Sequence, residues 1–330
     1  MKPERPKKLR TLATSPLRGE GLDRLNTMFD MIIDPWIEAE PLRIYSPEQL
    51  ADRLAEEEAS VLICEADLCS GPVFDLPLYA IASTRGDPTN IDIEGATKAG
   101  IPVLRAPGRN ADGVAELTVG LLIAATRRII PADSDVRTGN IFKDGTIPYQ
   151  RFRSWEIAGK TIGLVGLGAV GRATKWRMEG LGLKVIAYDP YSDESTKSLE
   201  ELIERSDIIS MHAPMTPETF AMISYEQFSK MRDGSIYINT ARAALHDENA
   251  LIESLQSGKL GAAALDHFEG EMLIEGHPLI KMSNVVLTPH IGGATYNTET
   301  NHTTMIADGL EELISGRAPA DLCNPEVIEH

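Results

Sequence analysis

Cysteine is scarce in this chain of 330 residues, which contains only Cys64, Cys69 and Cys323. An odd number of cysteines at irregular spacing gives no disulfide framework, and three reduced thiols are typical of a cytosolic protein. The sequence also lacks a long apolar run, and no apolar segment follows its basic, proline-containing start. We therefore expect a cytoplasmic protein with neither a membrane span nor a signal peptide.

Positive charge is also in short supply, because 32 lysines and arginines are set against 49 aspartates and glutamates. The resulting formal net charge of -17 repels phosphate backbones and anionic lipid. We therefore expect no nucleic acid and no membrane among the partners. An anionic small molecule would need a local basic site.

The length of the chain and its apolar pattern predict two α/β domains. Short apolar runs rich in β-branched residues alternate with helical patterns, which is typical of parallel sheets covered by helices. A helix is predicted over Pro47–Glu58, with Ser46 placed to cap its start. The strands predicted in the first third are Leu9–Ala13, Phe29–Ile33, Val61–Cys64, Tyr79–Ser83 and Pro102–Leu104.

The second part of the chain has a more regular alternation. Its six predicted strands are Thr161–Val165, Lys184–Tyr188, Asp207–Met211, Ser235–Asn239, Gly261–Leu265 and Asn284–Thr288. Six parallel strands in two halves make a doubly wound dinucleotide-binding sheet. The helix predicted over Asp247–Gln256 has Asp247 as its cap, whereas Phe268–Ser283 is predicted to be a loop.

Three further segments connect or cover these parts. A long connecting helix is predicted over Asp112–Arg128, and a final helix over Thr298–Ser315 that could return to pack on the first domain. The segment Pro131–Trp155 between them looks irregular, because Gly, Pro and Asp are scattered through it. This segment could be an excursion that packs on another subunit.

The strongest local motif is Gly166-Leu-Gly168-Ala169-Val170-Gly171, which directly follows a predicted strand and opens a helical pattern. Gly166 permits the tight turn, Gly168 lets the backbone approach a pyrophosphate, and Gly171 lets the helix lie close to the strand. The first N–H groups of the helix then face the phosphates. Asp189 ends the next strand, where a carboxylate accepts hydrogen bonds from the ribose hydroxyls and repels a 2′-phosphate, so NAD is favoured over NADP.

Further segments of the chain resemble the D-isomer-specific 2-hydroxyacid dehydrogenases, a group that includes the 3-phosphoglycerate dehydrogenases. They are Asn239-Thr-Ala-Arg242, Ala264-Leu-Asp266 with Glu271, and Thr288-Pro-His290-Ile-Gly-Gly293. The resemblance runs from about Ile81 to Pro325. It implies interconversion of a small anionic 2-hydroxy acid and its 2-oxo acid, and a homodimer.

The resemblance also implies a flavodoxin-like α/β substrate domain and a Rossmann domain. We place the substrate domain at residues 1–105 and 298–330, and the dinucleotide-binding domain at 106–297.

The chemistry of this reaction fits three residues that follow predicted strands. Arg242 can grip a carboxylate with its planar guanidinium fork. His290 can give a proton to the carbonyl oxygen in reduction and take it back in oxidation. Glu271 is expected to orient His290 and to stabilise the imidazolium, with Glu269 as the rival for this role.

The family pattern also implies further contacts to the cofactor and to the substrate. Asp266 matches the residue that holds the nicotinamide carboxamide, and backbone near His212 and Thr240 would line the cofactor cleft. The substrate loop matches Arg85-Gly86-Asp87, where backbone N–H groups would meet the substrate carboxylate.

Several positions depart from the family pattern. Asp87 brings a like charge toward an anion, whereas Arg85, Arg105 and Arg109 could bind a second anionic group or could be solvated loop charges. Ala243 and Ala244 replace a common Gly pair, Met272 replaces a common Pro, and His246 and His267 replace aliphatic residues. Because the histidines lack the close spacing of a zinc site, we expect no metal.

Two other functions share this scaffold. One is an NAD(H)-sensing interaction protein of the corepressor type, because a fold does not fix a function. The other is formate or phosphite oxidation, and Glu271 argues against the formate enzymes, which carry an amide there. The charge and the Arg242, Glu271 and His290 set favour the dehydrogenase.

Overall fold

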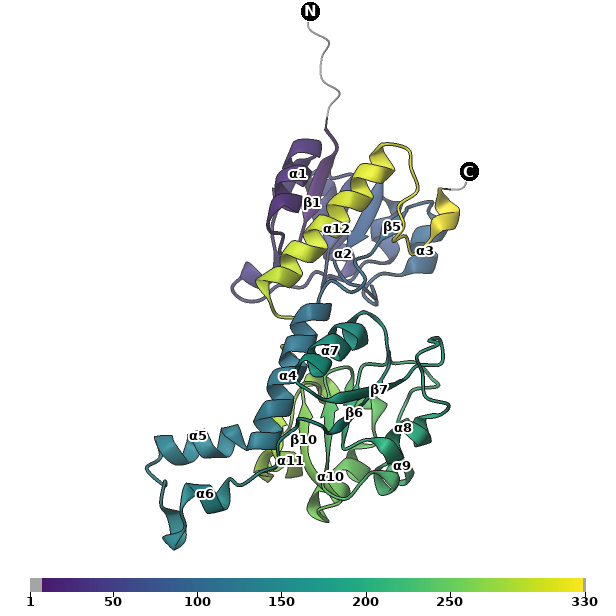
Figure 1. Cartoon of the computed structure of the whole chain (residues 1–330). Coiled ribbons are helices and arrows are strands. Elements are labelled where there is room, and N and C mark those ends of the chain that lie inside the picture. The colour runs from purple at the N-terminus through teal and green to yellow at the C-terminus, as the bar shows by residue number, and fades with distance from the viewer. Residues whose placement is uncertain (1–7, 329–330) are drawn as a thin grey trace, which may run out of the picture. The chain divides into compact units, whose positions relative to one another are not determined.

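The computed structural model describes residues 8–328 and divides into two compact units (Figure 1). One unit runs to Arg109 and resumes at Thr295, and the other is Asn110–Ala294. The first unit is therefore built from two stretches of chain that are far apart in the sequence. Each unit has its own sheet and its own core.

The first unit contains a parallel sheet of five strands in the order β2-β1-β3-β4-β5. This is the flavodoxin-like order that the resemblance implied. Each predicted strand is present and begins at the expected residue or one residue later. The strands are β1 (Arg10–Ala13), β2 (Asp30–Ile33), β3 (Val61–Cys64), β4 (Ala80–Ser83) and β5 (Val103–Leu104).

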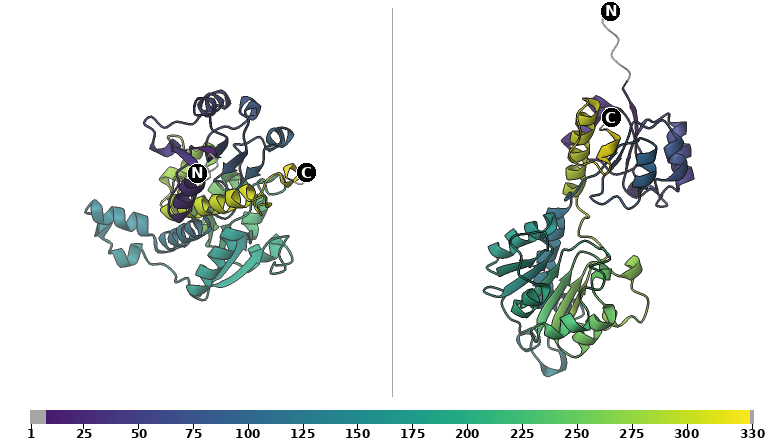
Figure 2. Two further views of the ribbon diagram at one scale, coloured as in Figure 1. Left: turned by 90° about the horizontal axis from the view of Figure 1, so that it is seen from above. Right: turned by 90° about the vertical axis from the view of Figure 1, so that its right-hand side faces the viewer.

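Helices cover both faces of this sheet, as the right-hand view of Figure 2 shows. On one face, α1 (Glu20–Met28) and α12 (Tyr296–Ile314) bury Leu25, Ile306 and Leu310 against alternate residues of the strands. On the other face lie α2 (Pro47–Glu56) and α3 (Ile93–Lys98). The short 3-10 helices are η1 (Trp36–Glu38), η2 (Gly71–Asp75) and η6 (Pro325–Val327).

Ser46 caps α2 as predicted, because its side chain accepts a hydrogen bond from the backbone N–H of Gln49. The Gln49 side chain in turn accepts from the Ser46 backbone N–H, which completes a capping box. The predicted final helix is also present as α12, although it begins two residues earlier than expected because Thr295 caps it.

The second unit contains a parallel sheet of six strands in the order β11-β10-β9-β8-β6-β7. β7 lies on one side of β6 and β8 on the other, so the direction of winding reverses beside β6. Ligands bind at such a reversal in doubly wound sheets. The strands are β6 (Thr161–Val165), β7 (Lys184–Tyr188), β8 (Ile208–Met211), β9 (Ser235–Asn239), β10 (Leu260–Leu265) and β11 (Val285–Leu287).

Helices again cover both faces of the sheet. α4 (Ala111–Arg127) lies beside α7 (Ala169–Gly180) on one face, while α8 (Leu199–Arg205), α9 (Tyr225–Lys230) and α10 (Glu248–Gln256) cover the other (Figure 1). Asp247 caps α10 as predicted, since its carboxylate accepts from the Ala250 backbone N–H. Among the described residues, no helix is both long and apolar enough to cross a bilayer.

Two segments have more helix than the sequence predicted. The irregular segment Pro131–Trp155 contains most of α5 (Ile129–Arg137), η3 (Lys143–Gly145) and α6 (Pro148–Arg151). The predicted loop Phe268–Ser283 contains η5 (Glu269–Glu271) and α11 (Pro278–Lys281). Pro148 and Pro278 stand at the first helical position, where the backbone N–H has no helical partner in any case, so proline is compatible with the start of each helix.

Candidate active site

The glycines of the turn between β6 and α7 fall into two groups. Gly166 has a φ of 99°, and a Cβ there would lie 2.6 Å from the Ala213 backbone nitrogen. A Cβ on Gly171 would lie 2.2 Å from the Gly166 carbonyl oxygen. The fold itself therefore requires these two glycines.

Gly168 is different, because no atom of the described residues, apart from its two chain neighbours, would lie within 4 Å of its Cβ. The protein alone does not require glycine there, so the open space is available to a ligand. The next residues, Ala169 and Val170, open α7 and carry backbone N–H groups without a helical partner. The turn therefore fits the pyrophosphate of a dinucleotide.

Asp189 follows β7 and lies at the rim of this turn. Its carboxylate accepts one hydrogen bond from the Leu167 backbone N–H at 2.7 Å and another from the Tyr191 backbone N–H at 2.9 Å. These two bonds fix the orientation of the carboxylate, and each oxygen keeps a lone pair for a ribose hydroxyl. The position and the fixed orientation fit NAD.

His212 and Thr240 follow the neighbouring strands β8 and β9. The His212 backbone lies so close to Gly166 that a Cβ on Gly166 would contact its carbonyl carbon. Its ring contacts Ser210 through Nε2, burial lowers the pKa of His212 to about 4, and its buried Nδ1 lacks a partner among the described residues. The Thr240 hydroxyl lies 3.0 Å from that of Thr118 on α4.

His290 and Glu271 form a pair at the ends of β11 and β10. His290 Nδ1 lies 3.0 Å from Glu271 Oε1. Because the carboxylate accepts, Nδ1–H donates and Nε2 is left for other chemistry. Both side chains are about half exposed, at 48 % and 56 %. Both residues also have a left-handed backbone, with φ of 53° for His290 and 59° for Glu271.

Asp266 anchors the loop that carries His290. The carboxylate is fully buried and accepts from the Thr288 hydroxyl at 2.6 Å and from the backbone N–H groups of Ile291 and Gly292 at 3.0 and 2.8 Å. The Asp266 carbonyl also accepts from the His290 N–H at 2.9 Å. The residue predicted to contact the cofactor therefore also fixes the backbone on both sides of His290.

Arg242 follows β9, which neighbours β10 in the sheet. Its backbone carbonyl accepts from the Asn239 side chain, and its exposed guanidinium donates to the Ala241 carbonyl at 2.6 Å. Arg242, His267 and Glu271 line one pocket at this end of the sheet. Arg242, Glu271 and His290 thus follow the carboxyl ends of three neighbouring strands, β9, β10 and β11.

His267, which has no role in the predicted site, also lies beside His290 and Glu271. Its side chain is 3 % exposed, and its ring centroid lies 3.8 Å from that of His290. Its Nδ1 lies 3.7 Å from the same Glu271 oxygen that contacts His290. Burial lowers the pKa of His267 to about 4, and the charges of His290 and Arg242 act in the same direction. Its place directly after Asp266 was the available signal.

The predicted substrate loop lies in the first unit. Ala106 donates its backbone N–H to the Arg85 carbonyl, and a Cβ on Gly86 would come within 3.1 Å of the Pro107 Cα. Asp87 is exposed. Burial raises the pKa of the Cys323 thiol, and Arg105 and Asp87 act on that thiol in opposite directions, so both charges lie near it.

The Arg109 side chain contacts two residues of the first unit, Glu65 and His302. Its guanidinium forms an ion pair with Glu65, and its Nη1 donates to His302 Nδ1 at 2.7 Å. His302 Nε2–H donates in turn to the Pro16 carbonyl, and the Trp36 indole N–H donates to Glu65. The structure therefore uses Arg109 to hold the first unit together, which argues against the suggestion that it binds a second anion.

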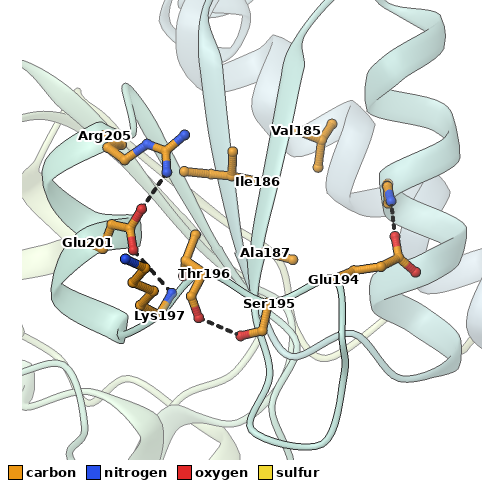
Figure 3. Close-up of a pocket in the computed structure, with 10 residues that line it drawn as sticks. Val185, Ile186, Ala187, Glu194, Ser195, Thr196, Lys197, Glu201 and Arg205 are labelled. Carbon is orange, nitrogen blue, oxygen red and sulfur yellow. Dashed lines mark hydrogen bonds and ion pairs between the residues drawn. The ribbon is translucent and has the colours of Figure 1, made fainter.

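A separate pocket lies beside β7, at the opposite edge of the six-stranded sheet (Figure 3). Val185 and Ala187 of the strand form one wall, and Glu201 of α8 bonds both Arg205 and the Lys197 backbone N–H. Because β10 and β11 stand at the other edge, this pocket is remote from His290 and Glu271. Arg242 and Glu271 line the pocket described above, and His290 contacts Glu271.

The chain is similar to several known proteins over most of its length. A glyoxylate reductase from Thermofilum pendens is 38% identical over 320 residues, covering 94% of this chain and 92% of that protein. A D-3-phosphoglycerate dehydrogenase from Archaeoglobus fulgidus is 39% identical over 248 residues, which are 73% of this chain and 46% of that protein. The crystal structure of the TT0316 protein from Thermus thermophilus has a TM-score of 0.81 and 32% identity, covering 96% of this chain and 100% of that chain.

The family assignment rests on the second unit above all. Residues 119–292 match the NAD binding domain of the D-isomer specific 2-hydroxyacid dehydrogenases. This match covers the glycine turn, Asp189 and the His290–Glu271 pair, and it confirms the resemblance, the fold class and the NAD cofactor expected from the sequence. The chain belongs to the D-isomer specific 2-hydroxyacid dehydrogenase family and is an NAD-dependent oxidoreductase of 2-hydroxy acids.

Proposed function

We propose that this enzyme interconverts a small D-2-hydroxy acid and its 2-oxo acid, with Arg242, Glu271 and His290 as its catalytic residues. The observation that carries the proposal is the His290–Glu271 pair. Its two members follow neighbouring strands, their Nδ1 and Oε1 atoms lie 3.0 Å apart, and both residues adopt a left-handed backbone. Non-glycine residues in that conformation are uncommon and concentrate at functional sites.

Each residue of the site has a distinct task. Bound NADH supplies the hydride that the carbonyl carbon of the 2-oxo acid accepts. His290, with Nδ1–H held by Glu271, gives the proton from Nε2 to the carbonyl oxygen, and in the reverse direction Nε2 takes the hydroxyl proton. Arg242 binds the substrate carboxylate through charge-assisted hydrogen bonds. Glu271 keeps the ring in the required tautomer and stabilises the imidazolium.

The proposal also assigns the residues that hold the cofactor and the substrate. The pyrophosphate would bind at Gly166–Gly171, and Asp189 would accept from the ribose hydroxyls. His212, Thr240 and Asp266 would line the nicotinamide side. We assign the backbone of Arg85, Gly86 and Asp87 to substrate binding, which makes the first unit the substrate domain. The second unit, which carries the cofactor residues, is then the dinucleotide-binding domain.

The substrate is proposed to be a small 2-oxo acid such as glyoxylate or hydroxypyruvate. Two observations support this size. A relative that covers nearly the whole chain is named a glyoxylate reductase, and Arg109 is committed to Glu65 and His302. A second anionic group would therefore depend on Arg85 or Arg105.

The first test is NADH consumption over a panel of 2-oxo acids, with His290→Asn run in parallel. The panel contains glyoxylate, hydroxypyruvate, phosphohydroxypyruvate and 2-oxoglutarate. We expect turnover of the smallest acids, and a loss of about 10²- to 10⁴-fold in His290→Asn because a general acid–base residue contributes about that much. His277→Asn is the matched control, since His277 pairs with Glu248 in the same unit and takes no part in the His290–Glu271 pair.

Either negative result would be informative. If every acid failed while NADH still bound tightly, the cofactor-sensing function would be favoured over catalysis. If His290→Asn kept full activity, the assignment of the acid–base residue would be wrong.

We further propose that two copies of the chain associate through the second unit. The segment 129–155, which we call the arm, leaves the body of that unit in Figure 1. Its apolar side chains include five that are more than half exposed: Ile130, Val136, Phe142, Tyr149 and Trp155. Exposed apolar surface of this kind marks an interaction site, and a second copy of the chain would cover it.

Sedimentation equilibrium tests this assembly. We expect the wild-type chain to have the mass of a dimer and a Phe142→Glu Trp155→Glu double variant to have the mass of a monomer. Leu42→Glu, which adds a charge at an exposed apolar position of the first unit, should leave the dimer intact. A double variant that stays dimeric would rule out the arm as the interface.

A further inference from the structure

We propose that His267, Glu271 and His290 form a three-ligand site for a divalent transition-metal ion such as Zn²⁺. One nitrogen of each imidazole and one carboxylate oxygen all lie within 4.8 Å of one another. Imidazole and carboxylate are ligands that Zn²⁺ accepts together. The sequence spacing does not reveal this set, because His267 and Glu271 follow β10 whereas His290 follows β11.

The distances are close to those that a metal requires. Glu271 Oε1 lies 3.0 Å from His290 Nδ1 and 3.7 Å from His267 Nδ1. Bonds of about 2.0–2.1 Å in tetrahedral geometry separate neighbouring ligand atoms by about 3.3 Å. These two distances lie on either side of that value, and the third pair, one nitrogen from each imidazole, lies within 4.8 Å.

The backbone holds the three ligands in place. Asp266 precedes His267 directly, and its side chain and carbonyl bond the backbone at His290, Ile291 and Gly292. These bonds keep the two imidazole rings adjacent. His267 provides a ligand from inside the protein, while the exposed His290 and Glu271 leave the site open to ions from solvent. Three protein ligands leave coordination positions for water.

The local charge favours a cation. Glu271 and the buried Asp266 carry two negative charges at this end of the sheet. Arg242 is a positive group that acts on His267 from the end of β9. The carboxylates therefore outnumber this guanidinium, although Arg242 sets a limit on the affinity.

A bound ion would inhibit turnover. This inhibition rests on the proposed function, whereas binding of the ion does not depend on that function. The ion would replace the hydrogen bond between His290 Nδ1 and Glu271, which the proposed acid–base chemistry needs. Sensitivity of turnover to the metal would therefore depend on the His267 imidazole.

The test begins with metal binding alone, in the full chain without a polyhistidine tag, cofactor or substrate. Co²⁺ is the probe, because its visible absorption reports the ligand geometry. We expect one Co²⁺ per chain, displaced by Zn²⁺, and a loss of affinity of about tenfold or more in His267→Val, since even outer partners of metal ligands contribute that much. The second variant is Glu271→Gln, which removes the charged ligand and should also weaken binding.

The matched control is His277→Ala. His277 Nε2 lies 3.0 Å from Glu248 Oε1, so this pair resembles His290 and Glu271 without a second imidazole beside it. We expect unchanged Co²⁺ affinity in this variant. Equal affinity in wild-type, His267→Val and Glu271→Gln chains, or a loss in His277→Ala, would overturn the proposal.

A second measurement separates the site from the proposed function. Zn²⁺ should inhibit NADH consumption by the wild-type enzyme, a chelator should reverse the inhibition, and His267→Val should need about tenfold more Zn²⁺ for the same effect. If the chain turned over none of the 2-oxo acids yet lost Co²⁺ binding in His267→Val, the metal site would stand and the proposed function would fall.

Discussion

At the scale of single residues, the two members of the His290–Glu271 pair both occupy the left-handed region. Each such residue costs about 1–3 kcal/mol and persists only where the surroundings hold it. For His290 those surroundings are the bonds from its own N–H and from Ile291 and Gly292 to Asp266. The strain therefore places the imidazole against Glu271 and His267, where the chemistry is proposed to occur.

The acid partner of His290 can be tested with two glutamates that stand two residues apart. Glu271→Gln should lower kcat by about 10²-fold or more, because the amide no longer stabilises the imidazolium during proton transfer. Glu269→Gln should leave kcat near the wild-type value, since Glu269 is exposed and the 3.0 Å contact to His290 belongs to Glu271. Steady-state kinetics with the best 2-oxo acid distinguishes them, and a larger loss in Glu269→Gln would reverse the assignment.

At the scale of elements, the sequence predicted the strands well because each is a short apolar run that ends in a polar or glycine residue. The sequence also predicted that candidate site residues follow the carboxyl ends of strands, because parallel strands place these ends on the same side of the sheet. The sequence could not show that His267 contacts His290. That contact depends on the pairing of β10 with β11 and on the bonds from Asp266 to the loop that follows β11. Nor could it show Arg109 bound to Glu65, since these residues meet only in the folded unit.

In the turn between β6 and α7, we expect substitution of Gly168 and of Gly171 to have different effects, although both are glycines of the same motif. Gly168→Ala should fold normally, because its φ of -71° suits alanine and, within the part of the chain that the structure describes, the added Cβ has only its chain neighbours within 4 Å. It should nevertheless weaken NADH binding by about tenfold, or about 1.4 kcal/mol, since the Cβ would fill the space of the pyrophosphate. Fluorescence titration with NADH measures this change.

Gly171→Ala is the comparison. Its Cβ would lie 2.2 Å from the Gly166 carbonyl oxygen, so α7 must move away from β6. Overpacking of this kind costs about 1–3 kcal/mol, and urea denaturation should show the loss. If Gly168→Ala were the destabilised variant and Gly171→Ala the stable one, the division of roles within the motif would be refuted.

At the scale of the whole molecule, buried histidines make stability depend on pH. Burial lowers the pKa of His246, His267 and His302 to about 4 each. Below the ordinary pKa of about 6.5, these imidazoles bind protons in the unfolded chain but stay neutral in the folded protein. This contribution to stability is therefore complete above about pH 6.5 and is lost as the pH falls toward 4, by up to about 1.4 kcal/mol per pH unit for each imidazole.

Urea denaturation at pH 7.5, 6.0 and 5.0 checks this dependence, and we expect the midpoint to fall with pH. In His302→Gln the amide can still accept from Arg109 and donate to Pro16, so the fold should persist with a shallower pH dependence. A midpoint that stayed constant from pH 7.5 to 5.0 would contradict the lowered pKa values, because it would mean that the folded and unfolded chains take up protons equally.

The discontinuous first unit has a consequence for how the chain is made. Its sheet is complete once β5 has been synthesised, yet one face lacks α12, whose Ile306, Leu310 and Leu313 cover that face together with α1. The Asn324 side chain also bonds the Val103 backbone N–H and the Ile101 carbonyl. On the ribosome, therefore, the unit that is translated first must wait with an uncovered apolar face while Asn110–Ala294 emerges and folds, and this interval is when a chaperone would have a surface to bind.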